Sequence, residues 1–365
     1  MNITIEKDLL VEKLQLASKF ISARLVSSTV LQGVLVEGTS ESIHFSATNL
    51  SSYFHTEVKE KHEGTFKLVI EPKKIIEFLH FLKPGTIQLE VKEKEIVISQ
   101  GKTKGAFPVI ISEDFPPFPS IDGDIQKIDR KFFEDQLPLV VFSASTDDSR
   151  PALTGVNIVK SDENLILVTT DGFRLSLIKM KGGISLPSVI IPADFLIEVS
   201  RGVKSDKTVE FSYSSQEKAV KFKTNEGDYV SRLIEGDFPQ YERIIQNECQ
   251  STIMVDREGF LRGIRLISVF ARDFSHIVVC EFKKDGLYMR PKKEATGENK
   301  TFQEIEIIGD EQTVAFNYKF LLDFLNSVKS KTIKIEILRP DAPVTFKVPD
   351  QESFLHVIMP VRLQE

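Results

Sequence analysis

Apolar and polar residues alternate along most of the chain, in short runs that are typical of half-buried β-strands. Three stretches interrupt this alternation in the same way, at residues 66–91, 187–211 and 312–337. Each holds a short apolar strand, a segment with apolar residues at helical spacing, a polar turn and another alternating strand. The pattern predicts a three-fold repeat with a period of about 120 residues.

The predicted helices in these stretches begin with residues that suit a helix start. Pro72 and Pro192 open the first two, where a missing N–H has no cost, and Asn317 is a favoured N-cap for the third. Each repeat has another predicted helix before this one. The predicted helices are 6–22, 72–83, 130–142, 192–204, 256–272 and 317–331.

The repeats also end alike, with closing strands at 106–118, 228–241 and 353–365. Each repeat thus holds two helices and roughly eight short strands. This content is too rich in strands for a helical solenoid and lacks the βαβ alternation of a doubly wound sheet. The sequence predicts an α+β fold of three similar domains at 1–122, 123–250 and 251–365.

Charge is unevenly divided between the predicted helices and the rest of the chain. The 365 residues carry a formal net charge of −6, but the predicted helices sum to +6 and the remainder to −12. Basic or neutral helices on an acidic framework indicate a surface that faces a polyanion. Ordinary solvation of helix faces explains the same pattern about equally well, so both interpretations stay open.

The sequence does not indicate secretion or a membrane span. No apolar run is long enough to cross a bilayer, and charges occupy the N-terminal ten residues where a signal peptide needs an apolar core. Cys249 and Cys280 form no disulfide framework. We expect a reduced, cytoplasmic protein.

Motifs for catalysis are missing from the sequence. The six histidines have no metal-ligand spacing, there is no G-x-S-x-G, and residues 99–105 lack the first glycine and the helix of a phosphate-binding loop. Asp147 and Asp148 fit loop solvation better than an acid–base pair. We expect no enzyme activity, no cofactor and no metal.

One polar cluster leaves its role open. Asp171-Gly172 favours a tight hairpin turn, because glycine accepts positive φ and aspartate tolerates it. Thr170, Asp171 and Arg174 either only build this turn or have a function of their own. One alternative is a small-molecule enzyme with a site between repeats around Asp171 and Arg174, and another is a β-repeat surface or adhesion protein.

Several motifs follow one another in a fixed order: "RPALTGVNI" (150–158), "TTDGFRLSL" (169–177), "DFPQYERII" (237–245), "FNYKFLLDFLNSV" (316–328) and "VIMPVRL" (357–363). Together with the three repeats, this order resembles the bacterial DNA polymerase III β subunit family, the sliding clamps. The resemblance implies a head-to-tail homodimer that closes into a ring, with helices lining the hole. It also implies sequence-independent contact with double-stranded DNA at the nucleoid. Polymerase, clamp loader and repair proteins would bind through short hydrophobic peptide motifs.

The resemblance further implies a hydrophobic peptide pocket at the junction of the second and third domains. Phe173 stands where a histidine is frequent and Phe320 where a tyrosine is frequent, so the pocket is expected to be more apolar. Gln364 and Glu365 follow Leu363, and the added carboxylate is expected either to weaken binding of acidic peptides or to shift the preference among partners. The expected pocket residues are Leu153, Thr170, Gly172, Phe173, Arg174, Leu175, Pro239, Arg243, Ile244, Phe274, Asn317, Phe320, Pro343, Val357, Met359, Pro360, Val361, Arg362 and Leu363.

Two further sets of residues follow from the resemblance and the helix pattern. Basic residues expected to contact DNA phosphates are Arg24, Lys73, Lys74, Arg150, Arg201 and Lys204, with Lys83, Arg262 and Arg265 as further candidates. Residues expected to close the ring are Phe107, Val109, Leu266, Val269 and Phe270. For each of these apolar residues the alternative is ordinary core burial.

Overall fold

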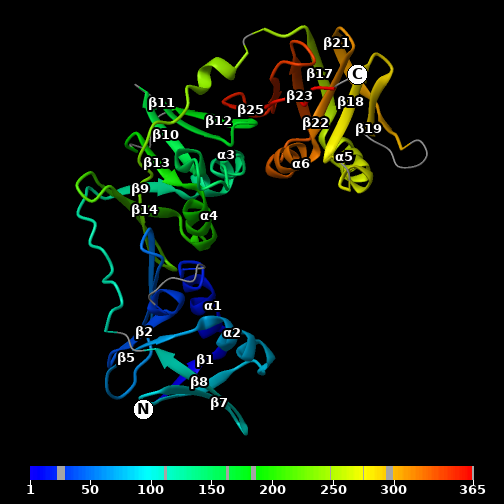
Figure 1. Ribbon diagram of the computed structural model, residues 1–365. Helices are drawn as coiled ribbons and strands as arrows, with labels where there is room; N and C mark the ends of the chain where they lie inside the picture. Colours follow the sequence, from blue (N-terminus) through cyan, green and yellow to red (C-terminus); the bar gives the residue numbers. More distant parts are fainter. Residues whose placement is uncertain are drawn as a thin grey trace. The chain divides into compact units, whose positions relative to one another are not determined.

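The computed structural model describes residues 1–22, 29–110, 113–161, 164–181, 186–246, 248–273, 275–292 and 299–363 (Figure 1). The chain forms two compact units. The first joins Met1–Arg130 to Asp194–Leu233, and the second joins Lys131–Ala193 to Ile234–Glu365. The predictions made for Arg24, Phe274 and the pair Gln364 and Glu365 lie outside the described residues.

A single antiparallel sheet of 12 strands runs through the first unit, in the order β1-β6-β7-β8-β5-β2-β3-β4-β16-β15-β14-β9. The strands from the first repeat are β1 (Asn2–Glu6), β2 (Val34–Gly38), β3 (Ile43–Thr48), β4 (Ser52–Val58), β5 (Phe66–Ile70), β6 (Thr86–Val91), β7 (Glu95–Gln100) and β8 (Thr103–Ile110). Those from the second repeat are β9 (Gln126–Asp129), β14 (Thr208–Ser214), β15 (Ala219–Thr224) and β16 (Gly227–Arg232).

The pairing of β4 with β16 makes this sheet continuous across two repeats. Phe54 lies opposite Tyr229 in the ladder, with ring centroids 4.9 Å apart. Phe20 stacks on Phe54 at 5.3 Å. Because these three rings are buried together, the two repeats share one aromatic core in this unit.

Among the described residues of this unit, three helices cover the sheet. α1 (Lys7–Ala17) and α2 (Pro72–Phe81) contact each other in the first repeat, with Leu14 and Leu79 completely buried (Figure 1). α4 (Ala193–Gly202) ends where its backbone passes Tyr229. A Cβ at Gly202 would lie 2.1 Å from the Tyr229 hydroxyl oxygen, so only glycine fits there.

The described residues of the second unit form two antiparallel sheets. The larger has nine strands in the order β13-β10-β11-β12-β25-β24-β23-β17-β21, and the smaller has four in the order β20-β19-β18-β22. The strands are β10 (Gly155–Ser161), β11 (Asn164–Thr170), β12 (Arg174–Lys181), β13 (Val189–Pro192), β17 (Ser251–Asp256), β18 (Ile277–Lys283), β19 (Gly286–Pro291), β20 (Thr301–Gln303), β21 (Ile305–Gly309), β22 (Gln312–Asn317), β23 (Thr332–Ile337), β24 (Val344–Lys347) and β25 (Phe354–Ile358).

α5 (Arg257–Ala271) and α6 (Tyr318–Ser327) contact each other on the strands of the third repeat (Figure 1). Asp256 caps α5 by accepting a hydrogen bond from the Gly259 amide at 2.7 Å. Asn317 caps α6 by accepting one from the Lys319 amide at 3.0 Å, which confirms the predicted N-cap.

The helix predicted over 130–142 is not continuous. β9 extends to Asp129, a π-helical turn occupies Phe132–Gln136, and α3 covers only Pro138–Val141. The Leu137 amide donates to the Phe132 carbonyl, five residues back, at 2.8 Å. Pro138 has no N–H to continue an α-helical ladder, so a regular helix through this segment was a wrong prediction.

The helices are also shorter than predicted, which changes the charge pattern. Among the described helices α2 carries +1, α5 +2, α4 −1 and the other three none, so they total +2 rather than +6. The remaining cations, such as Lys83, Lys204 and Lys329, follow the last helical turns. Cations there are also favoured by the helix dipole, so part of the excess has a structural cause.

Candidate functional site

The pairing of β12 with β25 creates an apolar cluster between the second and third repeats. Leu175 lies opposite Val357 in this ladder, and both are buried. The other buried members are Val168, Leu177 and Tyr241, and the half-buried residues packed on them include Phe238, Ile244 and Ile245. Three segments distant in sequence therefore share one apolar surface, which includes the expected pocket residues Leu175, Ile244 and Val357.

The turn before β12 is built by its own polar side chains. Asp171 Oδ1 accepts hydrogen bonds from the Phe173 amide at 2.8 Å and the Arg174 amide at 3.0 Å. Thr170 Oγ1 donates to the Arg174 carbonyl at 2.6 Å and accepts from the Gly172 amide at 3.1 Å. Gly172 has φ +93°, so the predicted tight turn with glycine at positive φ is present.

Phe173 and the C-terminal segment lie beside one another at this turn. The Met359 amide donates to the Phe173 carbonyl at 2.8 Å, and the Val361 amide donates to the Ala315 carbonyl at 2.8 Å. The Phe173 side chain is 59% exposed. These bonds bring Phe173, Met359 and Val361 close to the apolar cluster and leave an aromatic ring at its edge.

Arg174 is the charged centre of this region. Its Nε lies 3.0 Å from Asp171 Oδ2 and its Nη1 lies 2.5 Å from Asp323 Oδ2. The guanidinium carbon stands 4.7 Å from the Phe320 ring centroid and 5.7 Å from that of Phe142. The structure therefore gives Asp171 and Arg174 a structural role as partners, which accounts for the polar cluster noted in the sequence.

A buried polar column lies behind Arg174. His356 Nδ1 is 2.8 Å from Ser176 Oγ, which is 2.7 Å from Ser143 Oγ. The His356 ring stacks on Phe324 at 4.9 Å. Complete burial, and secondarily the Arg174 charge, holds the pKa of His356 well below its ordinary value of 6.5, so the imidazole is neutral.

Other expected pocket residues lie on the same unit with different exposure. Leu153 is buried in a 3₁₀ turn (Pro151–Thr154) that immediately precedes β10. Asn317 and Phe320 lie at the start of α6. The exposed or half-buried remainder are Pro239, Arg243, Pro343, Pro360, Arg362 and Leu363. Sequence reasoning missed Phe142, Tyr241 and Asp323, although Asp323 follows Phe320 at helical spacing, which places both on one face.

Apart from Arg24, which lies outside the described residues, the basic residues expected to contact DNA are exposed, but several already have acidic partners. Lys74 lies 3.8 Å from Glu71, and Arg201 pairs with Glu198. Lys204 pairs with Glu12 and lies 3.6 Å from Glu226. Lys73 is exposed on α2. These ion pairs reduce the net positive charge that a phosphate would meet.

Arg150 lies in an unexpected place for a DNA contact. Its Nε is 3.4 Å from Asp147 Oδ2. A Cβ built on Gly172 would lie 3.2 Å from Arg150 Nη1, so the guanidinium lies against the turn of the apolar cluster. Arg150 therefore lies beside the apolar cluster, and its contact with DNA stays a prediction.

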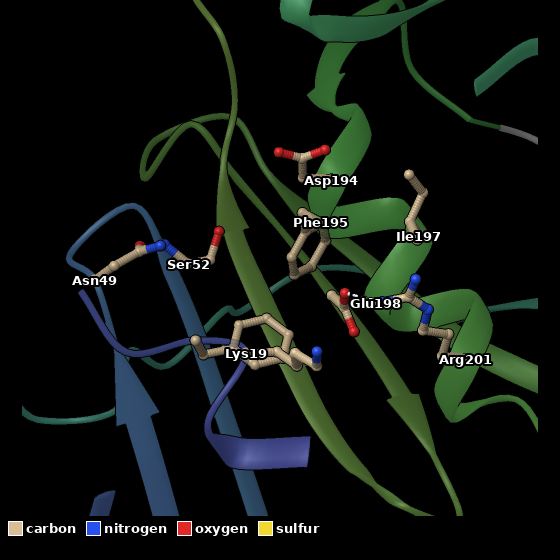
Figure 2. A pocket seen from close by; sticks show the side chains of 9 residues that line it. Lys19, Asn49, Ser52, Asp194, Phe195, Ile197, Glu198 and Arg201 are labelled. Carbon is tan, nitrogen blue, oxygen red and sulfur yellow. Dashed lines mark hydrogen bonds and ion pairs between the residues drawn. The ribbon is translucent and has the colours of Figure 1, made fainter. Parts of the chain in front are cut away.

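A cleft of about 310 Å³ opens on the first unit between the end of α1, the β3–β4 turn and α4 (Figure 2). Arg201 and Glu198 come from α4, Asn49 from the β3–β4 turn, Ser52 from the start of β4, and Lys19 from the segment after α1. The Lys19 ammonium makes no ion pair with the described residues. Two cations from different repeats thus border one open surface.

The residues expected to close the ring have unequal exposure. Leu266, Val269 and Phe270 on α5 are 53%, 50% and 45% exposed, so ordinary core burial is excluded for them within this chain. Phe107 and Val109 on β8 are half-buried, and the Phe107 ring lies 5.4 Å from that of Phe78. β8 pairs with β7 from Thr103 to Pro108 but with β5 only at Val109 and Ile110, leaving one edge partly open.

Metal-binding and membrane-spanning features are both missing from the part of the chain that the structure describes. No group of three or more His, Cys, Asp or Glu side chains there could hold a metal ion. No helix among the same residues is long and apolar enough to cross a membrane.

Similarity to known families extends over nearly the whole chain. The models of the DNA polymerase III beta subunit match with the N-terminal domain at residues 1–119, the central domain at 127–240 and the C-terminal domain at 242–362. The order of these matches follows the three-fold repeat. The predicted boundaries near residues 122 and 250 stay a prediction.

Relatives and solved structures agree with these matches. The beta sliding clamp of Bacillus subtilis (strain 168) is 26% identical over 380 residues, covering 99% of this chain and 100% of that protein. That of Treponema pallidum (strain Nichols) is 27% identical over 378 residues, covering 100% of both. The crystal structure of the Thermotoga maritima DNA polymerase III beta subunit matches with a TM-score of 0.89 at 23% identity, covering 100% of both chains. The sliding clamp structure from Bacillus subtilis matches with a TM-score of 0.86 at 25% identity, again over 100% of both chains.

Three repeated α+β domains, with helices packed on antiparallel sheets, define the class of DNA clamps. The chain belongs to the DNA polymerase III beta subunit family, the beta sliding clamps. It is the non-catalytic processivity subunit of DNA polymerase III, and the family implies interactions with DNA and with polymerase. The adhesion and small-molecule enzyme alternatives are therefore wrong.

Proposed function

We propose that two copies of this chain close head to tail into a ring around double-stranded DNA, without reading its sequence. We further propose that the apolar cluster of Leu175, Ile244 and Val357 is a pocket for short hydrophobic peptides of polymerase, clamp-loader and repair proteins. The domains in this proposal are residues 1–122, 123–250 and 251–365. The proposed place of action is the nucleoid, in the cytoplasm.

The observation that carries the peptide pocket is the convergence of β11, β12, β25 and the 238–245 segment on one apolar surface. Arg174, next to Leu175 on β12, contacts Phe320 and Asp323 of α6, so this helix lies beside that surface. Aliphatic and methionine side chains there offer contact area, and the exposed Phe173 ring adds an aromatic edge. Arg243 and Arg362 are exposed and adjoin Ile244 and Val361 in the chain, and we assign them to the polar rim of this pocket. This combination suits a peptide with leucine and phenylalanine anchors.

Ring closure is supported by unsatisfied surfaces on both units. α5 exposes three apolar side chains, and β8 leaves part of one edge open. In the second unit, β20 and β21 lie at sheet edges and expose Phe302 by 49% and Ile308 by 75%. Edge strands and apolar faces of this kind are normally covered, and a second copy of the chain would cover them.

The peptide pocket is tested by fluorescence anisotropy of a labelled Gln-Leu-x-Leu-Phe peptide. Micromolar binding is expected for the intact chain, and loss of binding for a variant that lacks 359–365, because Met359 and Val361 anchor the C-terminal segment at the pocket. A variant without only Gln364 and Glu365 is the control and should bind acidic peptides at least as tightly. An intact chain that binds no such peptide would contradict the proposed pocket.

A further inference from the structure

Arg174 is held between two carboxylates that come from different elements. Asp171 in the turn before β12 contacts Nε at 3.0 Å, and Asp323 on α6 contacts Nη1 at 2.5 Å. The Arg174 side chain is only 10% exposed, so its charge has little access to water. A nearly buried cation needs such partners, since an unpaired one would be costly.

Phe320 connects this ion cluster to the proposed pocket. The Arg174 guanidinium stands over the Phe320 ring at 4.7 Å. Phe320 and Asp323 are three residues apart on α6, so they lie on the same face of that helix. The pocket wall at Phe320 is therefore backed by a cluster of one cation and two carboxylates.

We infer that Asp323 is a specificity-determining residue of the peptide pocket. Arg174 alone would give the wall at Phe320 a charge of +1. The carboxylates of Asp171 and Asp323 change this to a net charge of −1. The wall selects peptides that present uncharged side chains to it and disfavours carboxylates. This inference rests on the proposed peptide binding and specifies the chemistry of its ligand.

The test compares two peptides, Gln-Leu-Ser-Leu-Phe and Gln-Leu-Asp-Leu-Phe, with identical neutral flanks. The wild-type chain should prefer the serine peptide, and Asp323→Asn should reduce the ratio of the two dissociation constants by about fivefold, the upper range for a half-exposed charge pair. Asp323→Glu keeps the charge and should restore the preference. Asp171→Asn, which keeps the Oδ1 acceptor of the turn, should change the ratio in the same direction as Asp323→Asn.

Asp310→Asn is the matched control, because this exposed residue lies at the opposite end of β22 from the start of α6. Its ratio should equal that of the wild type. Binding of both peptides with the same ratio in wild type and Asp323→Asn would overturn the inference while leaving peptide binding intact. Failure of the wild type to bind either peptide would instead contradict the proposed function, and the inference with it.

Discussion

Burial changes what a charged or titratable residue does in this protein. The Arg174 side chain at the start of β12 is 10% exposed. It binds Asp171 in the preceding turn and Asp323 on α6, and so connects the strand to that helix. His356 is completely buried and works as a neutral hydrogen-bond partner of Ser176. Neither environment follows fully from the sequence, because Asp323 is 149 residues from Arg174 and Ser176 is 180 residues from His356 in the chain.

The lowered pKa of His356 predicts a pH dependence of stability. The folded chain holds this imidazole neutral, whereas the unfolded chain protonates it near its ordinary pKa of 6.5. Because the unfolded state binds more protons below that pH, the free energy of unfolding falls as pH drops, by at most about 1.4 kcal/mol per pH unit for one group. Denaturant unfolding between pH 7.5 and 5 measures this slope (both pH values chosen about one unit or more from 6.5).

His356→Phe should flatten that slope, since a phenyl ring keeps the stack on Phe324 without titrating. His80→Gln is the control, because His80 is exposed at the end of α2, and its slope should match the wild type. An unchanged slope in His356→Phe would show that other groups dominate the acid sensitivity. His55 is one such group, because burial, and secondarily the charge of His44, lowers its pKa.

At the scale of secondary-structure elements, an ion pair connects α1 to the strands that the second repeat contributes to the 12-stranded sheet. Lys13 on α1 lies 2.7 Å from Glu226 in the β15–β16 turn, and their side chains are 10% and 16% exposed. Burial raises the pKa of Glu226, but the hydrogen bond and charge of Lys13 outweigh it, so this pKa lies below its ordinary value. The pair thus contributes stability at neutral pH that is lost as pH falls through this lowered pKa.

Glu226→Gln should therefore destabilise the chain by about 2 kcal/mol, less than a fully buried pair because both groups retain some water contact. Glu95→Gln removes an exposed partner of Lys92 and should cost clearly less, because water screens this pair. Chemical denaturation at pH 7 compares the two. Equally small losses of unfolding free energy in the two variants would mean that water screens the Lys13–Glu226 pair as much as the exposed Lys92–Glu95 pair.

Elements differed in how far the sequence could predict them. The starts of α2 and α6 followed from Pro72 and Asn317, because helix starts depend on local residues. The interruption around Pro138 was missed, since the apolar spacing on both sides still reads as one helix. The turn at Gly172 was predictable from two residues, whereas Asp323 entered the site only through the packing of α6 against β12.

At the scale of the whole molecule, the exposed face of α5 predicts assembly. Leu266→Asp or Phe270→Asp should convert a dimer into monomers, because a carboxylate would be buried against a second copy without a partner. Sedimentation equilibrium measures the mass. Ile125→Asp is the control and should leave the dimer intact, since Ile125 is 69% exposed beside β9, which ends the 12-stranded sheet far from β8 in the strand order. Dimers that persist in both α5 variants would contradict the proposed interface.

DNA contact should be weak and sensitive to salt, because much of the helical positive charge is already paired. Anisotropy measures binding to a linear duplex at several salt concentrations. The logarithm of the binding constant falls linearly with the logarithm of the salt concentration, and the magnitude of this slope falls by roughly 0.9 for each phosphate that the protein no longer neutralises. Lys19→Ala should lower the slope by about that amount, since its ammonium has no ion-pair partner among the described residues. Arg201→Ala and Lys204→Ala should have smaller effects, because Glu198, Glu12 and Glu226 already neutralise them. Equal slope changes in all three variants would mean that DNA phosphates displace these carboxylates. Arg201 and Lys204 would then contact DNA in the proposed ring, although both are paired in the free chain.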